Sequence, residues 1–288
     1  MKKLGLVLIL LVILSVASGC LGGEERTSTQ SESSSTYPSS TLQTTTTEKD
    51  TTTSTGNTET ESPRGYTREE LLQGVSGITK FTYVANALIH MNVTVNQEGI
   101  VQRDTLNLSI NEQGYLDFDG MKAWINTTTT SLPDGVSSNT SRIIIGDTMY
   151  IQTPVGMVEA EGGLGDPIWQ YNLVSLAKRY LTKEPEEREE NGELVLIYRL
   201  EERDAEALAK MYLALSPDAQ VSIKWGSMVL RFKDGKLVGG AMSYYAISEV
   251  VITDPSIGNM TIRQEALWEE SVEIREINEG IEISAPSI

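Results

Sequence analysis

The feature that most constrains the fold is a strict alternation of apolar and polar side chains that begins near residue 81. Between Thr82 and Asn96 every odd-numbered residue is apolar and most even-numbered residues are polar. Successive side chains of a strand point to opposite faces, so this pattern predicts a long strand with one dry face and one wet face. The pattern recurs at Val101–Asn111 and in several later segments up to residue 277. Alternation of this kind is typical of antiparallel sheets with one solvated face.

Three helices are expected among about ten strands. Thr67 and Glu70 have the spacing of a capping box, which predicts a short helix at the start of the folded part. A second helix is predicted over 166–183, with Asp166 as N-cap and Pro167 at the first helical position. A third is predicted over 204–217, ending at Ser216-Pro217. Strands with a few inserted helices predict an α+β fold class.

The N-terminus predicts export. Lys2 and Lys3 precede Leu4–Ala17, an apolar run shorter than the roughly twenty residues that a membrane-spanning helix needs. Small residues then lead to Cys20, the only cysteine of the chain. A basic start, a short apolar run and small residues are typical of a signal peptide, here residues 1–19. The segment resembles the lipobox of membrane lipoproteins, which implies lipid attachment at Cys20. An ordinary signal peptide followed by an unmodified cysteine is the alternative.

Residues 20–65 are predicted to be a disordered stalk. They are dominated by Ser and Thr and carry few apolar side chains, so they cannot bury enough surface to offset the entropy of ordering. The many Ser and Thr hydroxyls of this stalk could carry O-glycans, and an unmodified linker is the alternative. A single folded domain is therefore expected over 66–288, tethered to the outer face of the cell membrane by a lipid on Cys20.

The order of elements resembles the LolA/LppX lipoprotein superfamily. The similarity covers residues 66–288: an opening helix, long alternating strands, a helix after "YIQTPVG" (150–156) and a final strand leading to "ISAP" (283–286). The Thr-rich stalk is similar to that of archaeal surface lipoproteins. The resemblance implies a strongly curved antiparallel sheet, a half-barrel covered on its concave side by helices, with a lipid or acyl chain between them. The basic residues on which carrier members rely have no equivalents that can be placed in this sequence, so the resemblance does not extend to carrier activity.

This resemblance implies candidate residues for the lining of a hydrophobic cavity. They lie on the first two alternating strands and on the second and third helices: Ile89, Met91, Val93, Leu106, Leu108, Trp169, Leu173, Leu176, Leu208 and Met211. The alternative is a filled core, because most sheet faces covered by amphipathic helices enclose no ligand. Gly226, Gly239 and Gly240 lie inside predicted strands, where glycines allow a sheet to bend.

Catalytic motifs are missing from the sequence. His90, the only histidine, falls on the wet face of its strand, and a metal site or catalytic triad needs further partners. Asp117 and Asp119 flank a predicted turn, a more common role for such residues than calcium binding. We therefore expect no enzyme activity, no cofactor and no metal. From Tyr66 onward, 33 acidic and 18 basic residues give a negative charge that argues against nucleic acid as a partner.

Five sequons predict N-linked glycans in an exported chain, at Asn92, Asn107, Asn126, Asn139 and Asn259. Asn92 and Asn107 fall on the polar face of their strands, where a glycan would not disturb the core. The alternative is that Asn and Thr simply suit a wet sheet face.

Two classes of function follow from the sequence. The first is a lipid-anchored protein that binds a hydrophobic ligand at the membrane. The second is a non-enzymatic envelope protein with a solid core, which contacts other surface proteins through its acidic outer face. The volume and lining of the interior are expected to discriminate between the two.

Overall fold

The structure is a computed structural model that describes residues 65–160, 162–213, 219–254 and 258–286. The predicted signal peptide, Cys20 and the stalk up to residue 64 lie outside the described residues. So does the expected end of the third helix at Ser216-Pro217.

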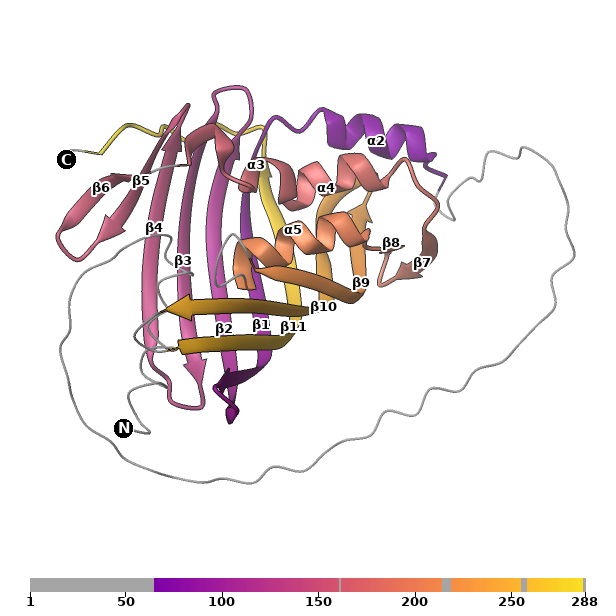
Figure 1. Cartoon of the computed structure of the whole chain (residues 1–288). Coiled ribbons are helices and arrows are strands. Elements are labelled where there is room, and N and C mark those ends of the chain that lie inside the picture. The colour runs from indigo at the N-terminus through magenta and orange to yellow at the C-terminus, as the bar shows by residue number, and fades with distance from the viewer. Residues whose placement is uncertain (1–64, 161, 214–218, 255–257, 287–288) are drawn as a thin grey trace, which may run out of the picture.

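The described strands form one open antiparallel sheet (Figure 1). Its order is β6-β5-β4-β3-β2-β1-β11-β10-β9-β8-β7. The sheet consists of two meanders that meet where the first strand pairs with the last. The strands are β1 (Lys80–Gln97), β2 (Ile100–Asp117), β3 (Lys122–Leu132), β4 (Ser137–Ile145), β5 (Thr148–Thr153), β6 (Gly156–Ala160), β7 (Glu186–Glu190), β8 (Glu193–Arg199), β9 (Gln220–Lys233), β10 (Lys236–Asp254) and β11 (Gly258–Ile277).

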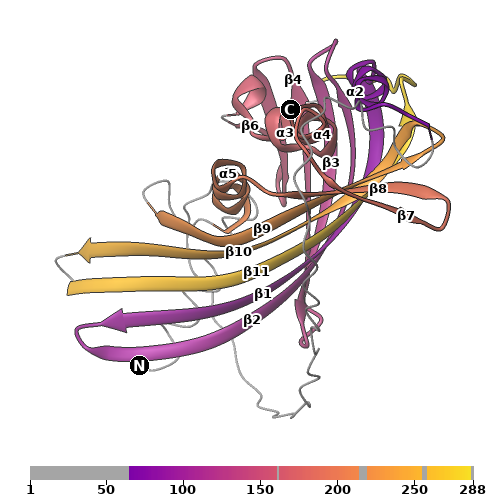
Figure 2. The same cartoon turned by 90° about the vertical axis from the view of Figure 1, so that its right-hand side faces the viewer.

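The alternation predicted for β1 is confirmed. Its odd-numbered residues from Phe81 to Val95 are all buried, and the even-numbered ones are exposed or half-buried. The sheet bends along its length, and Figure 2 shows β9, β10, β11, β1 and β2 curving together. The pairing of β9 with β10 shifts register between Leu237 and Gly239 and again beside Tyr245. Bulges of this kind bend and twist a sheet, and the first of them falls at a glycine for which the sequence predicts such a role.

The helices lie on the face of the sheet that carries the buried residues of β1, which we call the inner face. Trp268 of β11 belongs to this face and stacks on Tyr212 of α5 at a ring separation of 4.4 Å. In Figure 2, α5 lies over β9 on this side of the sheet. The helices are α2 (Arg68–Ser76), α3 (Ile168–Tyr171), α4 (Leu173–Tyr180) and α5 (Glu202–Leu213), with a 3₁₀ turn η1 (Gly163–Gly165).

Two helical predictions have different outcomes. The capping box of α2 is confirmed, since the Thr67 and Glu70 side chains each accept a hydrogen bond from the other residue's backbone N–H. The single helix predicted over 166–183 is wrong, because α3 and α4 are separate. Asn172 between them has extended backbone angles, and its side chain accepts from the Ser175 N–H and donates to the Ile168 carbonyl. A side chain that caps the backbone in this way competes with helix continuation.

A second difference concerns the acidic run 184–193, whose composition predicts a solvated loop. Part of it forms β7, which pairs with β8 at the edge of the sheet. Glutamate has a low intrinsic preference for strands, so the composition of this segment concealed the strand. Charged residues on an edge strand discourage pairing with another chain, which gives Glu a physical role there.

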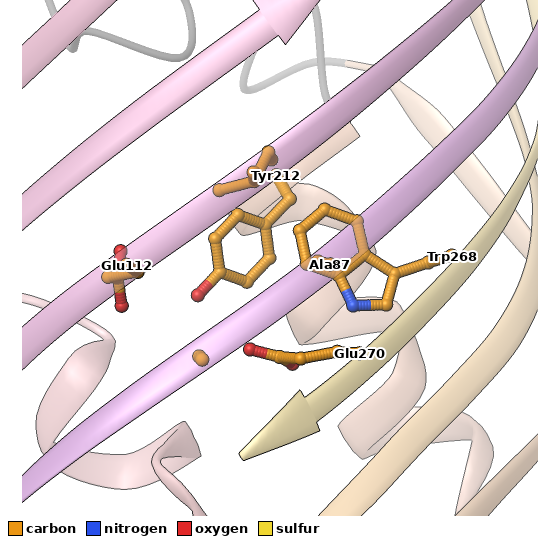
Figure 3. A pocket seen from close by; sticks show the side chains of 7 residues that line it. Ala87, Glu112, Tyr212, Trp268 and Glu270 are labelled. Atoms are coloured by element: carbon orange, nitrogen blue, oxygen red, sulfur yellow. The ribbon is translucent and has the colours of Figure 1, made fainter. Parts of the chain in front are cut away.

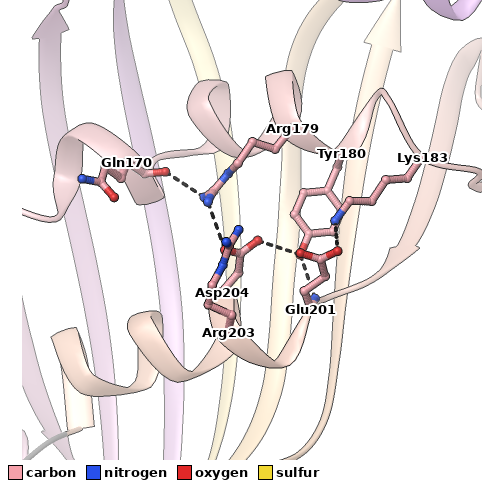
Figure 4. Close-up of polar contacts among 7 residues, drawn as sticks. All are labelled: Gln170, Arg179, Tyr180, Lys183, Glu201, Arg203 and Asp204. Atoms are coloured by element: carbon pink, nitrogen blue, oxygen red, sulfur yellow. Dashed lines mark hydrogen bonds and ion pairs between the residues drawn. The ribbon is translucent and has the colours of Figure 1, made fainter.

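A buried carboxylate joins α4 to α5 (Figure 4). Asp204 of α5 is fully buried, with 0% of its surface exposed. It accepts hydrogen bonds from Arg179 Nη1 and from the Tyr180 hydroxyl, both at 3.0 Å. The Tyr180 oxygen also accepts from the Glu201 N–H at 2.7 Å, and Arg179 Nη2 donates to the Gln170 carbonyl. These bonds fix α3, α4 and α5 relative to one another.

Gly240 lets α4 approach the sheet, and Gly240→Ala is expected to destabilise the protein. A Cβ there would overlap the carbonyl oxygen of Val229 and lie 2.9 Å from Leu173 Cδ1 of α4. Because the first neighbour is backbone, relief requires movement of β9, and we expect a loss of about 2 kcal/mol or more in urea unfolding. Gly280→Ala is the control, since its Cβ would meet no atom within 4 Å. Equal stability of the two variants would contradict this role for Gly240.

Candidate functional site

An apolar strip runs along the inner face of β2, β1 and β11. Strand register places Ile89 beside Leu108 and Trp268, and places Met91 beside Leu106 and Ala266. We define the inner strip as these residues together with Val93 and Ile262. Its β1 and β11 members are buried, while Leu106 and Leu108 of β2 are half-buried. The five strand candidates from the sequence therefore form one continuous surface.

The five helical candidates form a second group. Trp169, Leu173, Leu176 and Leu208 are buried in the hydrophobic core, and Met211 is half-buried against it. Leu173 also lines a small hollow under α3 and α4. The others fill space between the helices and the sheet, as ordinary core residues do.

Two carboxyl groups lie at inner-face positions beside Ala85 and Ala87, and Asp104, opposite Val93, is a third acid on this face. Glu112 of β2 lies opposite Ala85 of β1, and Glu270 of β11 lies opposite Ala87. The two glutamates therefore flank β1 from opposite sides, offset by two residues. Sequence reasoning missed both. Each glutamate could have been noticed as an acid at a position where the alternation calls for an apolar residue. That β2 and β11 both pair with β1, which brings the two glutamates together, can be seen only in the folded structure.

Both carboxyl oxygens of Glu112 accept hydrogen bonds, whereas one carboxyl oxygen of Glu270 accepts none from the described residues. The Tyr83 hydroxyl donates to Glu112 Oε1 at 2.7 Å, and Thr127 Oγ1 donates to Oε2 at 2.8 Å. Glu270 Oε2 is shielded from solvent and has no hydrogen-bond partner in the part of the chain that the structure describes. The Trp268 side chain beside this carboxyl favours its charged form and so opposes the rise of its pKa. A buried carboxyl oxygen without a partner is destabilising unless it is protonated or is hydrogen-bonded to a water or a ligand.

Arg142 of β4 is the cation that acts on this group of side chains. Its Nη1 donates to Asp166 Oδ2 at 3.0 Å. Burial opposes the charge of Arg142, but the carboxylates of Asp166 and Glu112 outweigh it and raise the pKa of the guanidinium. The cluster defined by Glu112, Glu270, Asp166 and Arg142 thus contains three acids and one base.

Burial sets the protonation of the inner-face carboxyl. Loss of hydration and, secondarily, the charge of Glu112 raise the pKa of Glu270 to about 8. Burial also raises the pKa values of Tyr83, Tyr212 and Tyr244 well above the ordinary value. These tyrosines therefore stay neutral near pH 8, and Glu270 is the group that changes charge in that range.

Two small hollows lie beside these carboxyls, and both are lined by Glu112, Glu270 and Tyr212. The first, of about 10 Å³, is also lined by Ala87 and Trp268 and is shown in Figure 3. There the Tyr212 hydroxyl and the two carboxyl groups lie around one space. The second, of about 20 Å³, extends under α3 and α4. Each has room for about one water-sized group.

Further along the inner face, two buried polar side chains have an oxygen atom without a partner in the described part of the chain, although Gln264 Nε2 donates to Met91 Sδ at 3.2 Å. Ser248 of β10 is opposite Gln264 of β11, which is opposite Val93 of β1. Gln264 is 2% exposed and Ser248 4%. The Gln264 Oε1 and Ser248 Oγ atoms have no hydrogen-bond partner among the described residues. Between Ala266 and Ile262 of β11, the inner strip therefore contains polar atoms whose hydrogen bonds are left to water or to a bound molecule.

The five sequons all lie on the outer face. Register places Asn92, Asn107, Asn126, Asn139 and Asn259 on the side opposite the inner strip. Four are exposed, and Asn107 is half-buried with its Oδ1 bonded to His90. Glycosylation stays a prediction, but this placement leaves room for glycans.

The other polar residues singled out in the sequence lie away from the inner strip. His90 is exposed on the outer face. Asp117 Oδ1 accepts from the Gly120 N–H at 2.7 Å and its Oδ2 pairs with Lys80, which fits the turn interpretation. Within the described ranges no three His, Cys, Asp or Glu side chains gather as metal ligands do. The same ranges contain no helix with the length and hydropathy needed to cross a membrane.

No family model matches the chain, and no curated protein matches it. Among solved structures, LprF from Mycobacterium bovis is 10% identical with a TM-score of 0.35, over 76% of this chain and 97% of that one. A putative outer membrane lipoprotein-sorting protein domain from Vibrio parahaemolyticus is 9% identical with a TM-score of 0.20, over 68% and 87%. Lipovitellin is 9% identical with a TM-score of 0.30, over 73% and 26%. TM-scores below 0.5 do not establish a shared fold, so the function of this chain has to follow from its own residues.

Proposed function

We propose that this protein is a lipid-anchored lipoprotein of the outer face of the cell membrane, and that it binds a hydrophobic ligand along the inner strip. Cys20 would carry the lipid, and residues 20–65 would set the distance from the membrane. Two buried chains hold a protein on a bilayer where one is marginal, since each methylene contributes about 0.8 kcal/mol.

The observation that carries the proposal is the inner strip together with the unpartnered oxygen atoms of Gln264 and Ser248. Ile89, Met91 and Val93 follow one another on a curved sheet, and Gln264 and then Ser248 lie beside Val93 on the neighbouring strands. A purely structural core would be expected to satisfy its buried polar atoms internally. An apolar row with open hydrogen-bonding positions is instead typical of ligand sites, which combine apolar walls with a few polar groups.

A brominated chain tests the proposal, because bromine in contact with an indole quenches its fluorescence. Trp268 lies on the inner strip, so 11-bromoundecanol is expected to quench part of the tryptophan fluorescence saturably. Trp268→Phe should abolish that quenching. Trp225→Phe, which removes an indole 47% exposed, should retain it. Absence of saturable quenching in the wild-type protein would overturn the proposal.

A second candidate function is a non-enzymatic envelope protein with a filled interior. It is favoured by the small size of the two hollows, about 10 and 20 Å³, against roughly 300 Å³ or more for common ligand pockets. In that case 11-bromoundecanol would not quench, and chemical crosslinking on cells would capture surface proteins through the outer face.

A further inference from the structure

We propose that Glu112 and Glu270 form a binding site for the primary ammonium group of an amphiphile whose hydrocarbon chain lies along the inner strip. This inference rests on the proposed function, because the chain of the amphiphile needs the strip. It adds the chemistry of the headgroup and the place where that headgroup binds.

The two carboxyls reach one space because the strand between them carries small side chains. Ala85 and Ala87 of β1 face Glu112 and Glu270 across the register and line the first hollow. Tyr212 of α5 closes the space from above and stacks on Trp268 at 4.4 Å. The site is therefore built from three strands and a helix.

The site has more acidic than basic side chains. Glu112, Glu270 and Asp166 are three acids, and Arg142 is the basic residue among them, already bonded to Asp166. A buried carboxylate is costly unless it is paired and hydrogen-bonded. An ammonium group has three N–H donors, and Glu270 Oε2 is an acceptor with no partner among the described residues. The aromatic rings of Tyr212 and Trp268 add surfaces that attract cations.

The size of the site selects the kind of cation. Hollows of about 10 and 20 Å³ accept one water-sized group, which fits a primary ammonium and excludes a trimethylammonium. The next pair along the strands is Ile89 with Trp268, which begins the inner strip. A headgroup at Glu270 thus places its first methylenes beside the Ile89–Trp268 pair, where Tyr212 covers one face of the Trp268 ring.

Displacement of 11-bromoundecanol tests this at pH 8.5, where an alkylamine is still protonated, since amines of the lysine type titrate near about 10.4. The competitors are dodecylammonium, dodecyltrimethylammonium and dodecanol, each below its micelle-forming concentration. We expect dodecylammonium to restore Trp268 fluorescence at a concentration about 10-fold or more below the other two, as for a hydrogen bond between charged groups.

Two variants and a control decide the outcome. Glu270→Gln and Glu112→Gln should each remove the advantage of dodecylammonium. Glu269→Gln removes the same charge from the exposed face of the same strand and should keep the advantage. The inference would be overturned if all three competitors restored fluorescence at the same concentration, or if dodecylammonium remained the strongest competitor in Glu270→Gln. A bound proton would then be what neutralises the Glu270 carboxylate. Absence of quenching by 11-bromoundecanol itself would instead remove the proposed function.

Discussion

Replacing Glu270 by Gln is expected to stabilise the protein by on the order of 3 kcal/mol at pH 9 and to change its stability little at pH 5. The reason is that the pKa of Glu270 is raised to about 8, mainly by burial. Each unit of pKa corresponds to roughly 1.4 kcal/mol between the two protonation states. Glutamine has nearly the same shape as a protonated glutamate and never becomes charged.

The direction of the effect follows from proton binding. Between about pH 4.5 and pH 8 the folded protein holds a proton on Glu270 that the unfolded chain releases. Stability of the wild-type protein therefore falls as pH rises through this window and levels off above it. Glu112 on β2 and Arg142 on β4 act electrostatically within the same cluster, and the neutral tyrosines 83, 212 and 244 pack beside it.

Urea unfolding of wild-type and variant proteins from pH 5 to pH 9 measures this difference. Subtracting the two curves cancels titrating groups that the substitution does not affect. The control is Glu269→Gln, on the exposed face of the same strand. Its unfolding free energy should change with pH as that of the wild type does. If the difference in unfolding free energy between the wild type and Glu270→Gln is the same at every pH, then Glu270 does not hold a proton in this range.

The sheet was largely predictable because burial of one face imposes a period of two on the sequence. The strand from residue 80 to 97 and its buried odd-numbered residues follow from this alone. The prediction failed where local chemistry departed from that rule. β7 contains "EEREE", and its pairing with β8 outweighs the low strand preference of Glu. The helix predicted over 166–183 is broken by a cap at Asn172 that a helical stripe does not reveal.

The candidate site was only half predictable. Ile89, Met91, Leu106 and Leu108 could be chosen from alternation, and strand register makes them neighbours. Glu112 and Glu270 are separated by more than 150 residues in the chain. They flank the same strand because the last strand pairs with the first, which no local pattern encodes. An acid at an apolar position marks each residue as unusual, but only the register shows that the two share one hollow.

Asp204→Ala is expected to destabilise the protein more than Gly240→Ala does, by about 3–5 kcal/mol in urea unfolding. It removes the carboxylate that accepts hydrogen bonds from Arg179 and Tyr180, and it leaves a charged guanidinium and a buried hydroxyl without their partner. Removing one member of such a pair costs more than the pair itself contributes, because the Tyr180 hydroxyl and the partly buried Arg179 guanidinium lose an acceptor that water replaces only in part.

The matched comparison is Glu201→Gln, which removes the carboxylate from an exposed ion pair with Lys183 of the same network. The backbone N–H of residue 201 still donates to Tyr180, so little loss is expected. Asp204→Ala should also act on the site, since α5 carries Tyr212, which stacks on Trp268. Loosening of α5 is therefore expected to speed hydrogen exchange at residues 202–213 before the sheet is affected. Uniform exchange throughout the chain would show that α5 has no separate stability and that Asp204 supports the fold only as a whole.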